Sequence, residues 1–158
     1  MNKFILVKYK LMKYHDYLLK VLKWECPFCD MDKMRIIEKW KHFTVILSRA
    51  PYVKDHVLIV PNRHLVRLWE ITPEEWSTFI PLMEKWMKKL EKIHKEVNLL
   101  LRDGVANGVL WKSIDHLHFH LIPGCPVYSA HSWWDRKIYS DYQLWKVTSE
   151  FKTKYKWK

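Results

Sequence analysis

The sequence predicts an α+β fold in which one long helix crosses a mostly antiparallel β-sheet. Two β-branched runs, at residues 43–47 and 56–61, are bounded by prolines and indicate neighbouring strands. Strict alternation of histidine with apolar residues at 115–123 indicates a third strand whose two faces differ in chemistry. A stripe of apolar residues at three-to-four spacing, beginning at Trp76, indicates the helix.

The predicted long helix has a defined start. Thr72 is the expected N-cap, Pro73 takes the first helical position, and Glu75 completes a capping box with Thr72. Residues 99–110 are expected to add a further strand, because Asp-Gly and Asn-Gly pairs there mark turns. The apolar stripe of the helix, which we expect to lie in the core, comprises Trp76, Phe79, Ile80, Met83, Trp86, Met87, Leu90, Ile93 and Val97.

The 158 residues fit one domain with short extensions. We expect an N-terminal amphipathic extension at 1–22, the main domain at 23–124, and an aromatic, basic C-terminal extension at 125–158 that packs on the same domain. Residues 8–22 place apolar side chains at helical spacing. We expect this helix to pack on the core rather than lie on a membrane, because its apolar face is short and Asp16 interrupts its positive charge.

Composition and charge favour anionic partners. Lys and Arg total 28 against 17 Asp and Glu, which leaves a formal net charge of +11. The positive electrostatic field of such a chain attracts nucleotides, nucleic acid or acidic membranes. The 49% apolar share argues against disorder over most of the chain. No run approaches the roughly 20 apolar residues of a spanning helix, and the apolar stretch at 4–7 is too short for a secretory signal. We therefore expect a cytoplasmic protein without membrane association.

Three histidines at alternate positions, His116, His118 and His120, carry the clearest chemical signal. In a strand, residues two apart lie roughly 6.6 Å from each other and residues four apart roughly 13 Å. Two adjacent imidazoles can therefore share a metal ion, but three in a row cannot. The other interpretation is that one imidazole attacks phosphorus as a nucleophile while its neighbour donates a proton or a hydrogen bond.

The order of motifs resembles that of the histidine-triad (HIT) superfamily of nucleotide hydrolases and transferases. Residues 116–122, His-Leu-His-Phe-His-Leu-Ile, are similar to its signature of three histidines alternating with apolar residues. Residues 51–64 are similar to its Pro-x-x-x-Gly-His-φ-φ-φ-φ-Pro-x-x-His block. The resemblance covers about residues 24–124. It implies a HIT-like catalytic domain, a nucleotide hydrolase or nucleotidyltransferase. This enzyme would act at the α-phosphate of nucleoside phosphoramidates or dinucleoside polyphosphates through a covalent nucleotidyl-histidine intermediate.

The resemblance also implies the roles of four histidines and the nature of the partners. His118 would be the nucleophile, His120 would contact the phosphate, His116 would orient its neighbour, and His56 would brace the row from the adjacent strand. The substrate would contain adenosine, no organic cofactor would be needed, and the protein would form a homodimer.

Substrate contacts follow from the same resemblance. Ser113 would contact a phosphate oxygen or the leaving group, and Lys112 stands where relatives carry a Gln that serves the leaving group. Ser48 stands where relatives use Asp or Asn on the ribose hydroxyls, and we expect it to share that contact with Arg49. The candidates for the base pocket, each of which is as readily explained by core packing, are Phe28, Ile46 and Leu47.

Cys26 and Cys29 form a Cys-x-x-Cys pair, which alone is half of a zinc site or a redox pair. The redox interpretation needs a thioredoxin-like βαβ context, which the sequence does not predict. Relatives complete a tetrahedral site with the last histidine of the block at 51–64 and the first histidine of the triad, here His64 and His116. The resemblance therefore implies a structural zinc held by these four residues.

The C-terminal extension leaves a second function open. Residues 125–158 carry nine aromatic residues and seven Lys or Arg against three acids, a mixture typical of single-strand nucleic-acid surfaces. The alternative function is thus a nucleic-acid-directed module, which removes 5′-adenylate or binds single strands without catalysis. The other interpretation is an extension folded over the sheet, which we favour for Trp133, Trp134 and Trp145, while residues 151–158 are expected to fray.

Overall fold

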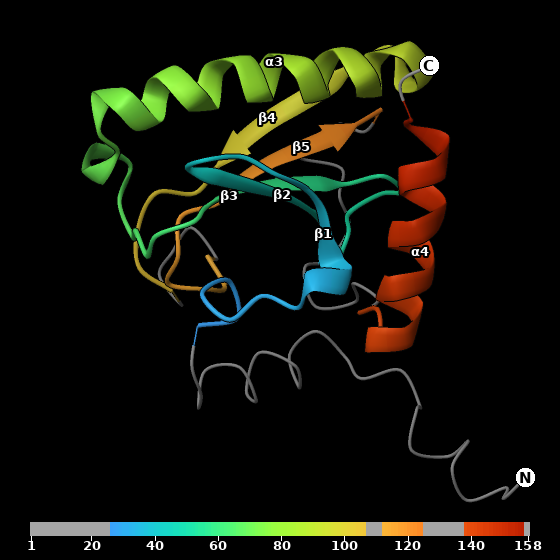
Figure 1. Ribbon diagram of the computed structural model, residues 1–158, viewed down its shortest axis with the longest axis horizontal. Helices are drawn as coiled ribbons and strands as arrows, with labels where there is room; N and C mark the ends of the chain where they lie inside the picture. The colour runs from blue at the N-terminus through green and yellow to red at the C-terminus, as the bar shows by residue number, and fades with distance from the viewer. Residues whose placement is uncertain (1–25, 107–111, 125–137, 157–158) are drawn as a thin grey trace, which may run out of the picture.

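The computed structural model describes residues 26–106, 112–124 and 138–156 (Figure 1). Five strands form one sheet in the order β1-β2-β3-β5-β4, and every neighbouring pair is antiparallel. The strands are β1 (Ile36–Lys39), β2 (Phe43–Leu47), β3 (Val57–Pro61), β4 (Val97–Leu101) and β5 (Phe119–Pro123). The helices are α3 (Pro73–His94) and α4 (Asp141–Lys154), with 3-10 turns η2 (Lys33–Arg35) and η3 (Leu68–Glu70). The predicted α+β class is confirmed, whereas the helix expected at 8–22 lies outside the described residues.

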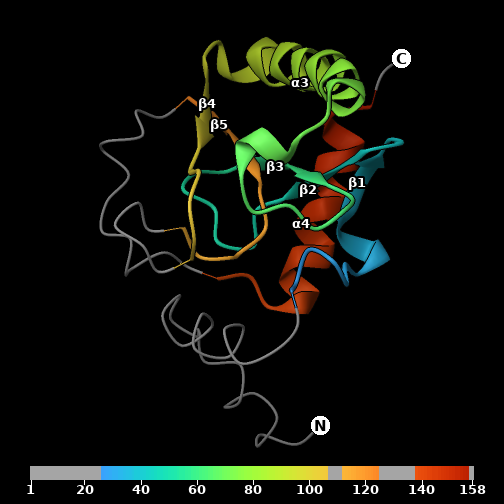
Figure 2. The same cartoon turned by 90° about the vertical axis from the view of Figure 1, so that its left-hand side faces the viewer.

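The two helices cover different parts of the sheet. Helix α3 packs against β4 and β5, and α4 packs against β1, β2 and the η2 turn (Figures 1 and 2). The main core lies between the sheet and these helices, and both Phe79 of α3 and Phe151 of α4 belong to it. A smaller apolar cluster, Phe28, Ile46, Leu58 and Val60, lies apart from this core.

Helix α3 begins as the sequence predicts. The Thr72 side chain accepts a hydrogen bond from the Glu75 amide, and the Glu75 carboxylate accepts one from the Thr72 amide. The buried face of α3 is narrower than expected, however. Ile80 is 49% exposed and Ile93 is 46% exposed, because Ile80 is rotated by about 100° from Phe79 around the helix axis and Ile93 lies in the last turn.

The strand that carries the histidines is shorter than predicted. β5 begins at Phe119, so His116 and His118 precede the hydrogen-bonded ladder. The Leu117 amide in this segment donates to the carbonyl of Leu65, which holds the segment against the loop after β3. Only His120 of the three therefore takes its position from strand pairing. This matters for the site, because the other two imidazoles are free of the strict alternation of a strand.

Helix α4 is the main feature that the sequence interpretation missed. Ser140 caps it with a capping box to Gln143, and the helix buries Leu144, Phe151 and the following Tyr155. The expectation that residues 151–158 fray is thus wrong for 151–155, because apolar contacts with the core outweigh the basic composition. Trp145 lies on this helix, which packs against β1 and β2, but its side chain is 43% exposed. Trp133 and Trp134 lie outside the described residues.

Candidate functional site

Strand register places one row of side chains across the face of the sheet that bears the candidate site. Ile36 pairs with Ile46, Ile46 with Leu58, and Leu58 with His120. Directly paired residues of antiparallel strands point to the same face. Their neighbours along the strands, such as Ile59, point to the opposite face and enter the main core. Period-two alternation thus brings His120 onto the surface that bears Leu58 and Ile46.

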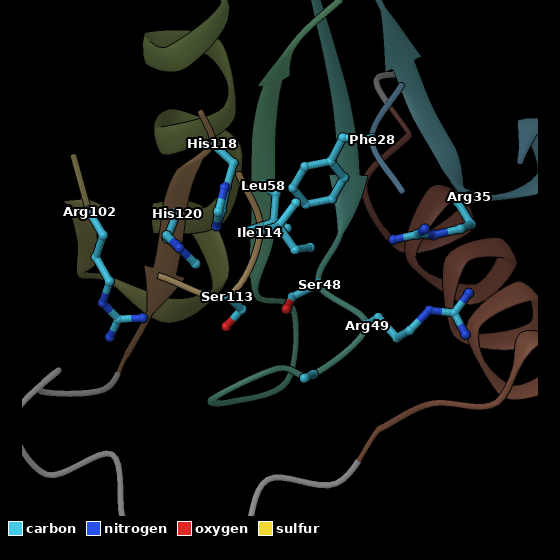
Figure 3. Close-up of a pocket in the computed structure, with 11 residues that line it drawn as sticks. Phe28, Arg35, Ser48, Arg49, Leu58, Arg102, Ser113, Ile114, His118 and His120 are labelled. Atoms are coloured by element: carbon cyan, nitrogen blue, oxygen red, sulfur yellow. The ribbon is translucent and has the colours of Figure 1, made fainter. Parts of the chain in front are cut away.

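A pocket enclosing about 530 Å³, open solvent at its mouth included, lies on this surface (Figure 3). His118, His120, Ser113 and Arg102 lie on one side of it in the view of Figure 3, and Arg35 and Arg49 on the other. The lining residues are Phe28, Arg35, Ser48, Arg49, Ala50, Leu58, Arg102, Ser113, Ile114, His118 and His120.

Hydrogen bonding and burial determine the tautomer and the charge of the His118 imidazole. Its Nδ1 lies 2.7 Å from the carbonyl oxygen of His116, so Nδ1 carries the proton and donates. Nε2 therefore holds the lone pair. Burial lowers the pKa of His118 to about 4, so the ring is neutral near pH 7. A neutral imidazole with a fixed tautomer is the form that can attack an electrophile.

A second chain of hydrogen bonds fixes the tautomer of His120. The backbone amide of Tyr52 donates to Nδ1 of His56 over 3.2 Å, which leaves the His56 proton on Nε2. That Nε2 lies 3.0 Å from Nδ1 of His120, so His56 donates and His120 accepts. The proton of a neutral His120 is then on its Nε2. His120 is thereby a hydrogen-bond donor for an anion.

Three of the four predicted substrate-binding residues line the pocket, and one does not. Ser113, Ser48 and Arg49 are lining residues. Lys112 is 2% exposed and points elsewhere, because its ammonium donates to the carbonyls of Val66 at 2.8 Å and Gly104 at 2.7 Å. Its adjacency to Ser113 in the sequence does not bring it to the site, and a role at the leaving group is not supported. Of the base-pocket candidates, Phe28 lines the pocket whereas Ile46 and Leu47 are buried.

Sequence reasoning missed two arginines of the pocket. Arg35 comes from the η2 turn and is 7% exposed, and Arg102 follows the end of β4. The Arg102 guanidinium donates to the hydroxyl of Tyr52 over 2.7 Å. Neither residue belongs to a motif, and only the pairing of β1 and β4 into the sheet brings them near the histidines. The net charge of +11 was the one sequence signal that pointed to such cations.

Four side chains near the histidine row form a candidate metal centre. One ligand atom from each of Cys26, Cys29, His64 and His116 lies within 4.8 Å of all the others. The Cys29 sulfur is 3.2 Å from Nδ1 of His64, and the Cys26 sulfur is 3.3 Å from Nδ1 of His116. Tetrahedral zinc with two sulfur and two nitrogen ligands separates its ligand atoms by roughly 3.3–3.8 Å. The cluster therefore has the donor set and nearly the spacing of such a site.

The tautomer of His116 also fits a metal ligand. Its Nε2 lies 2.9 Å from the carbonyl oxygen of Pro61 and donates to it, so Nδ1 faces the cysteines as a lone pair. Burial lowers the pKa of His116 to about 4, which keeps the ring neutral. Burial and the neighbouring Cys26 raise the pKa of the Cys29 thiol to about 11, so a cation beside this sulfur would favour its thiolate near pH 7.

Fold and site together define a protein that presents a row of oriented imidazoles, beside a Cys/His metal-binding cluster, to a cationic pocket on an antiparallel sheet. Residues 31–127 match the HIT domain, and the chain belongs to this family.

Similar proteins agree with this assignment. The adenosine 5′-monophosphoramidase of Schizosaccharomyces pombe is 31% identical over 102 residues, which cover 62% of this chain and 73% of that protein. The asymmetrical bis(5′-nucleosyl)-tetraphosphatase of the same yeast is 28% identical over 91 residues, 56% of this chain and 48% of that protein. The structure of a Zn-bound histidine triad family protein from Mycobacterium smegmatis has the same fold, with a TM-score of 0.57 and 19% identity over 82% of this chain and 96% of that one.

Within residues 26–106, 112–124 and 138–156, no helix combines the length and apolar character needed to cross a bilayer.

Proposed function

We propose that this protein is a nucleotide hydrolase that acts at the α-phosphate through a covalent intermediate on His118. The observation that carries the proposal is the hydrogen bond from His118 Nδ1 to the His116 carbonyl, which aims Nε2 into a pocket lined by cations and hydroxyls. The phosphoramidase of S. pombe, 31% identical, supports an adenosine nucleotide with a P–N bond as substrate. The tetraphosphatase supports dinucleoside polyphosphates as a second substrate class.

The proposed reaction has two displacements at phosphorus. Nε2 of His118 attacks the α-phosphorus, a P–N bond to the ring forms, and the leaving group departs with its bonding electron pair and takes up a proton. Water then attacks the same phosphorus, which releases the nucleoside monophosphate and restores the neutral ring. His120 Nε2–H, the Ser113 hydroxyl and the Arg102 guanidinium stabilise the charge that develops on the phosphoryl oxygens and the leaving group.

Replacement of the nucleophile tests this function. His118→Ala should lower kcat/KM for an adenosine phosphoramidate and for a diadenosine polyphosphate by at least about 1,000-fold, because the covalent route is lost. His42→Ala is the matched control, since His42 lies outside the pocket and contacts Glu74. A rapid acid quench of the wild-type reaction should show a mass increase of one adenylyl group. Undiminished turnover by His118→Ala would refute the assignment.

We also propose that the metal held by Cys26, Cys29, His64 and His116 is a structural zinc ion. Four protein ligands leave no position for substrate, so the ion would fasten the segment around Cys26 to the one that carries His118. The Zn-bound structural relative supports zinc over other metals. In this arrangement His116 acts on catalysis only by holding the carbonyl that binds His118 Nδ1.

A homodimer is the proposed assembly. Strand β4 lies at the edge of the sheet, and Leu99 in it is 46% exposed. An edge strand with exposed apolar side chains is a template for pairing with a second chain. The nearby Ile93, also 46% exposed at the end of α3, would add apolar surface to the same interface.

One observation favours the nucleic-acid-directed function as a second candidate. Tyr142 and Trp145 of α4 are 68% and 43% exposed, and their ring centroids lie 6.0 Å apart. Exposed aromatic rings on a basic helix can stack on unpaired bases. Binding of a labelled single-stranded oligonucleotide, measured at several salt concentrations, separates the two functions. A polynucleotide surface should give an affinity that falls steeply with salt, and Trp145→Ala should lower that affinity. An affinity that Trp145→Ala leaves unchanged would exclude this surface.

A further inference from the structure

The end of the pocket away from the histidines carries positive charge that the proposed reaction does not use. Arg35 and Arg49 line this end, whereas the reacting phosphate is served by His118, His120 and Arg102 on the other side (Figure 3). Among the described lining residues there are three arginines and no carboxylate. A nucleoside monophosphate bound at His118 would place its only phosphate near the histidines and its neutral part nearer the end of the pocket that Arg35 and Arg49 line.

The orientation of a bound nucleotide follows from what lies between the two ends. Phe28, Leu58 and Ile114 form an apolar wall, and the Phe28 ring centroid lies 5.2 Å from that of His118. A base fits against this wall, so the ribose is directed toward Ser48 and the arginines beyond it. Ser48 is a small hydroxyl residue at the end of β2 and is followed directly by Arg49.

The register of the sheet gives the length of this path. The row from His120 through Leu58 and Ile46 to Ile36 crosses three strand spacings, which amount to about 14 Å. Arg35 directly precedes Ile36 and is buried. Its long side chain therefore covers part of the interval, and its guanidinium lies on the side of the pocket where the nucleoside, not the leaving group, would be.

One partner of Arg49, the Asp141 carboxylate, is exposed to solvent and can be exchanged for another anion. Arg49 donates to the carbonyl of Tyr139 at 3.2 Å and to the carboxylate of Asp141 at 2.6 Å. The Asp141 side chain is 86% exposed, and ion pairs with so exposed a partner add little stability. A phosphate that reaches Arg49 inside the pocket can replace Asp141 as its partner, and the planar guanidinium suits phosphate oxygens well.

We propose that Arg35 and Arg49 form a second anion subsite, which binds a phosphate carried on the 2′ or 3′ oxygen of the ribose. Nucleotide sites distinguish a free ribose from a phosphorylated one by charge: a carboxylate accepts hydrogen bonds from the hydroxyls, whereas an arginine accommodates the phosphate. The described lining residues of this pocket include arginines and no carboxylate, which favours the phosphorylated ribose. The preferred substrate is then an adenosine nucleotide with its cleavable bond at the 5′ α-phosphate and a second phosphate on the ribose. This inference rests on the proposed function, since that function places the α-phosphate at His118.

Equilibrium binding of three nucleotides tests the subsite without any need for turnover. Adenosine 5′-monophosphate, adenosine 2′,5′-bisphosphate and adenosine 3′,5′-bisphosphate are titrated into the full-length protein by calorimetry. One bisphosphate should bind at least about 10-fold more tightly than the monophosphate, because charge-assisted hydrogen bonds to two guanidinium groups are added. Which isomer binds more tightly identifies the ribose oxygen that carries the phosphate.

Variants assign the preference to the two arginines. Arg35→Gln and Arg49→Gln should each reduce the bisphosphate preference, taken as the ratio of the two dissociation constants, to about threefold or less. Because Arg35 is buried, a thermal melt of every variant checks that it still folds. Arg35→Lys, which keeps the positive charge, is measured beside Arg35→Gln. Lys88→Gln on α3 removes the same charge from a site 70% exposed, and Arg102→Gln removes it from the opposite side of the pocket. Both controls should retain the preference.

The outcomes separate the subsite from the reaction. Equal binding of all three nucleotides by wild type, or a preference that persists in both Arg35→Gln and Arg49→Gln, overturns the subsite. If Lys88→Gln abolishes the preference as well, the effect is one of net charge and the subsite is likewise refuted. Turnover of an adenosine phosphoramidate, measured in parallel, reports on the proposed function alone. Wild-type turnover without a bisphosphate preference leaves that function intact and removes only the subsite.

Discussion

Nε2 of His56 lies 3.0 Å from Nδ1 of His120, and both rings are buried. The two side chains come from the loop before β3 and from β5, 64 residues apart in the sequence. Because the Tyr52 amide occupies the other nitrogen of His56, the direction of this hydrogen bond is determined. His56 is the donor, and it acts on the pocket through His120 as a positioning residue.

Loss of this donor should affect catalysis more than binding. His56→Phe keeps the volume of the ring but removes the hydrogen bond to His120, so the His120 tautomer is no longer fixed. We expect kcat to fall roughly 5- to 30-fold, corresponding to about 1–2 kcal/mol, with KM changed by less than about twofold. His56→Gln, which retains an N–H donor, should recover part of the loss. Steady-state kinetics on an adenosine phosphoramidate provides the measurement, and a change confined to KM would contradict the positioning role.

Loss of the metal should lower the stability of the fold, whereas replacement of the proposed nucleophile His118 should leave the metal bound. Cys26→Ala should lose the bound zinc and about 3 kcal/mol of stability, which corresponds to a fall in Tm of roughly 6–12 °C for a chain of this size. His118→Ala should retain about one zinc per chain. Metal content by mass spectrometry and Tm by scanning fluorimetry give the two readouts. Full zinc content in Cys26→Ala would show that Cys26 is not a ligand of the bound metal.

A buried carboxylate couples the loop before His56 to the end of the chain. Oδ2 of Asp55 accepts hydrogen bonds from His94 at 2.9 Å, from the Tyr155 hydroxyl at 2.8 Å and from the Lys154 ammonium. Burial by itself would raise the pKa of Asp55, but these three donors reverse the effect and hold it below its ordinary value. The residue also has a φ of 65°, a conformation that Asp and Asn tolerate better than most residues.

Asp55→Asn should therefore destabilise the protein in a pH-dependent manner. At pH 7 we expect a loss of about 2 kcal/mol, because the Lys154 ammonium and the two other donors lose their anionic partner. A carboxyl group with a lowered folded pKa stabilises the fold above its unfolded pKa of about 3.9, and this stabilisation is lost as the pH falls through the folded value. The difference between wild type and variant should thus be complete at pH 6 and shrink below pH 4.

Urea denaturation at a series of pH values measures this difference. Glu84→Gln is the matched control, since it removes a carboxylate from an exposed pair with Lys88, and it should cost less than about 0.5 kcal/mol. A difference between wild type and Asp55→Asn that stays constant from pH 7 to pH 3 would show that charge is not the source of the effect.

A charge in the edge strand should disrupt the proposed dimer. Leu99→Lys places an ammonium in β4, where a second chain would pair, and charged edge residues oppose such pairing. We expect a homodimer for wild type and a monomer for the variant by sedimentation velocity at micromolar concentration. Ile80→Lys, at an equally exposed site on α3, should stay dimeric. A wild-type monomer at all concentrations would refute the proposed assembly.

Local signals were sufficient for part of the fold. The capping box of Thr72 and Glu75 determines the start of α3 because both partners lie within one turn. The β-branched run at 43–47 coincides with β2 because both faces of that strand are buried. By contrast, β1 is four residues long and was not predicted, since its pairing with β2 rather than its composition makes it a strand.

Parts of the candidate site depend on contacts that spacing cannot reveal. Lys112 is adjacent to Ser113 in the sequence, but the carbonyls of Val66 and Gly104 hold its ammonium away from the pocket. Arg35 and Arg102 enter the pocket because β1 and β4 are joined to the same sheet as His120. The pairing of β3 with β5, which joins the two halves of the sheet, links residues 60 to 64 positions apart, and no periodicity in the sequence records it.

The sequence by itself determined which chemical groups are present and in what local order: three alternating histidines, a Cys-x-x-Cys pair and a strongly basic composition. The tertiary structure decided what each imidazole does. His116 turns Nδ1 toward the cysteines because the Pro61 carbonyl accepts from its Nε2, and His118 presents Nε2 to the pocket because the His116 carbonyl accepts from its Nδ1. The physical reason is that the tautomer of a histidine depends on the partners that the folded chain supplies, and most of these come from distant segments.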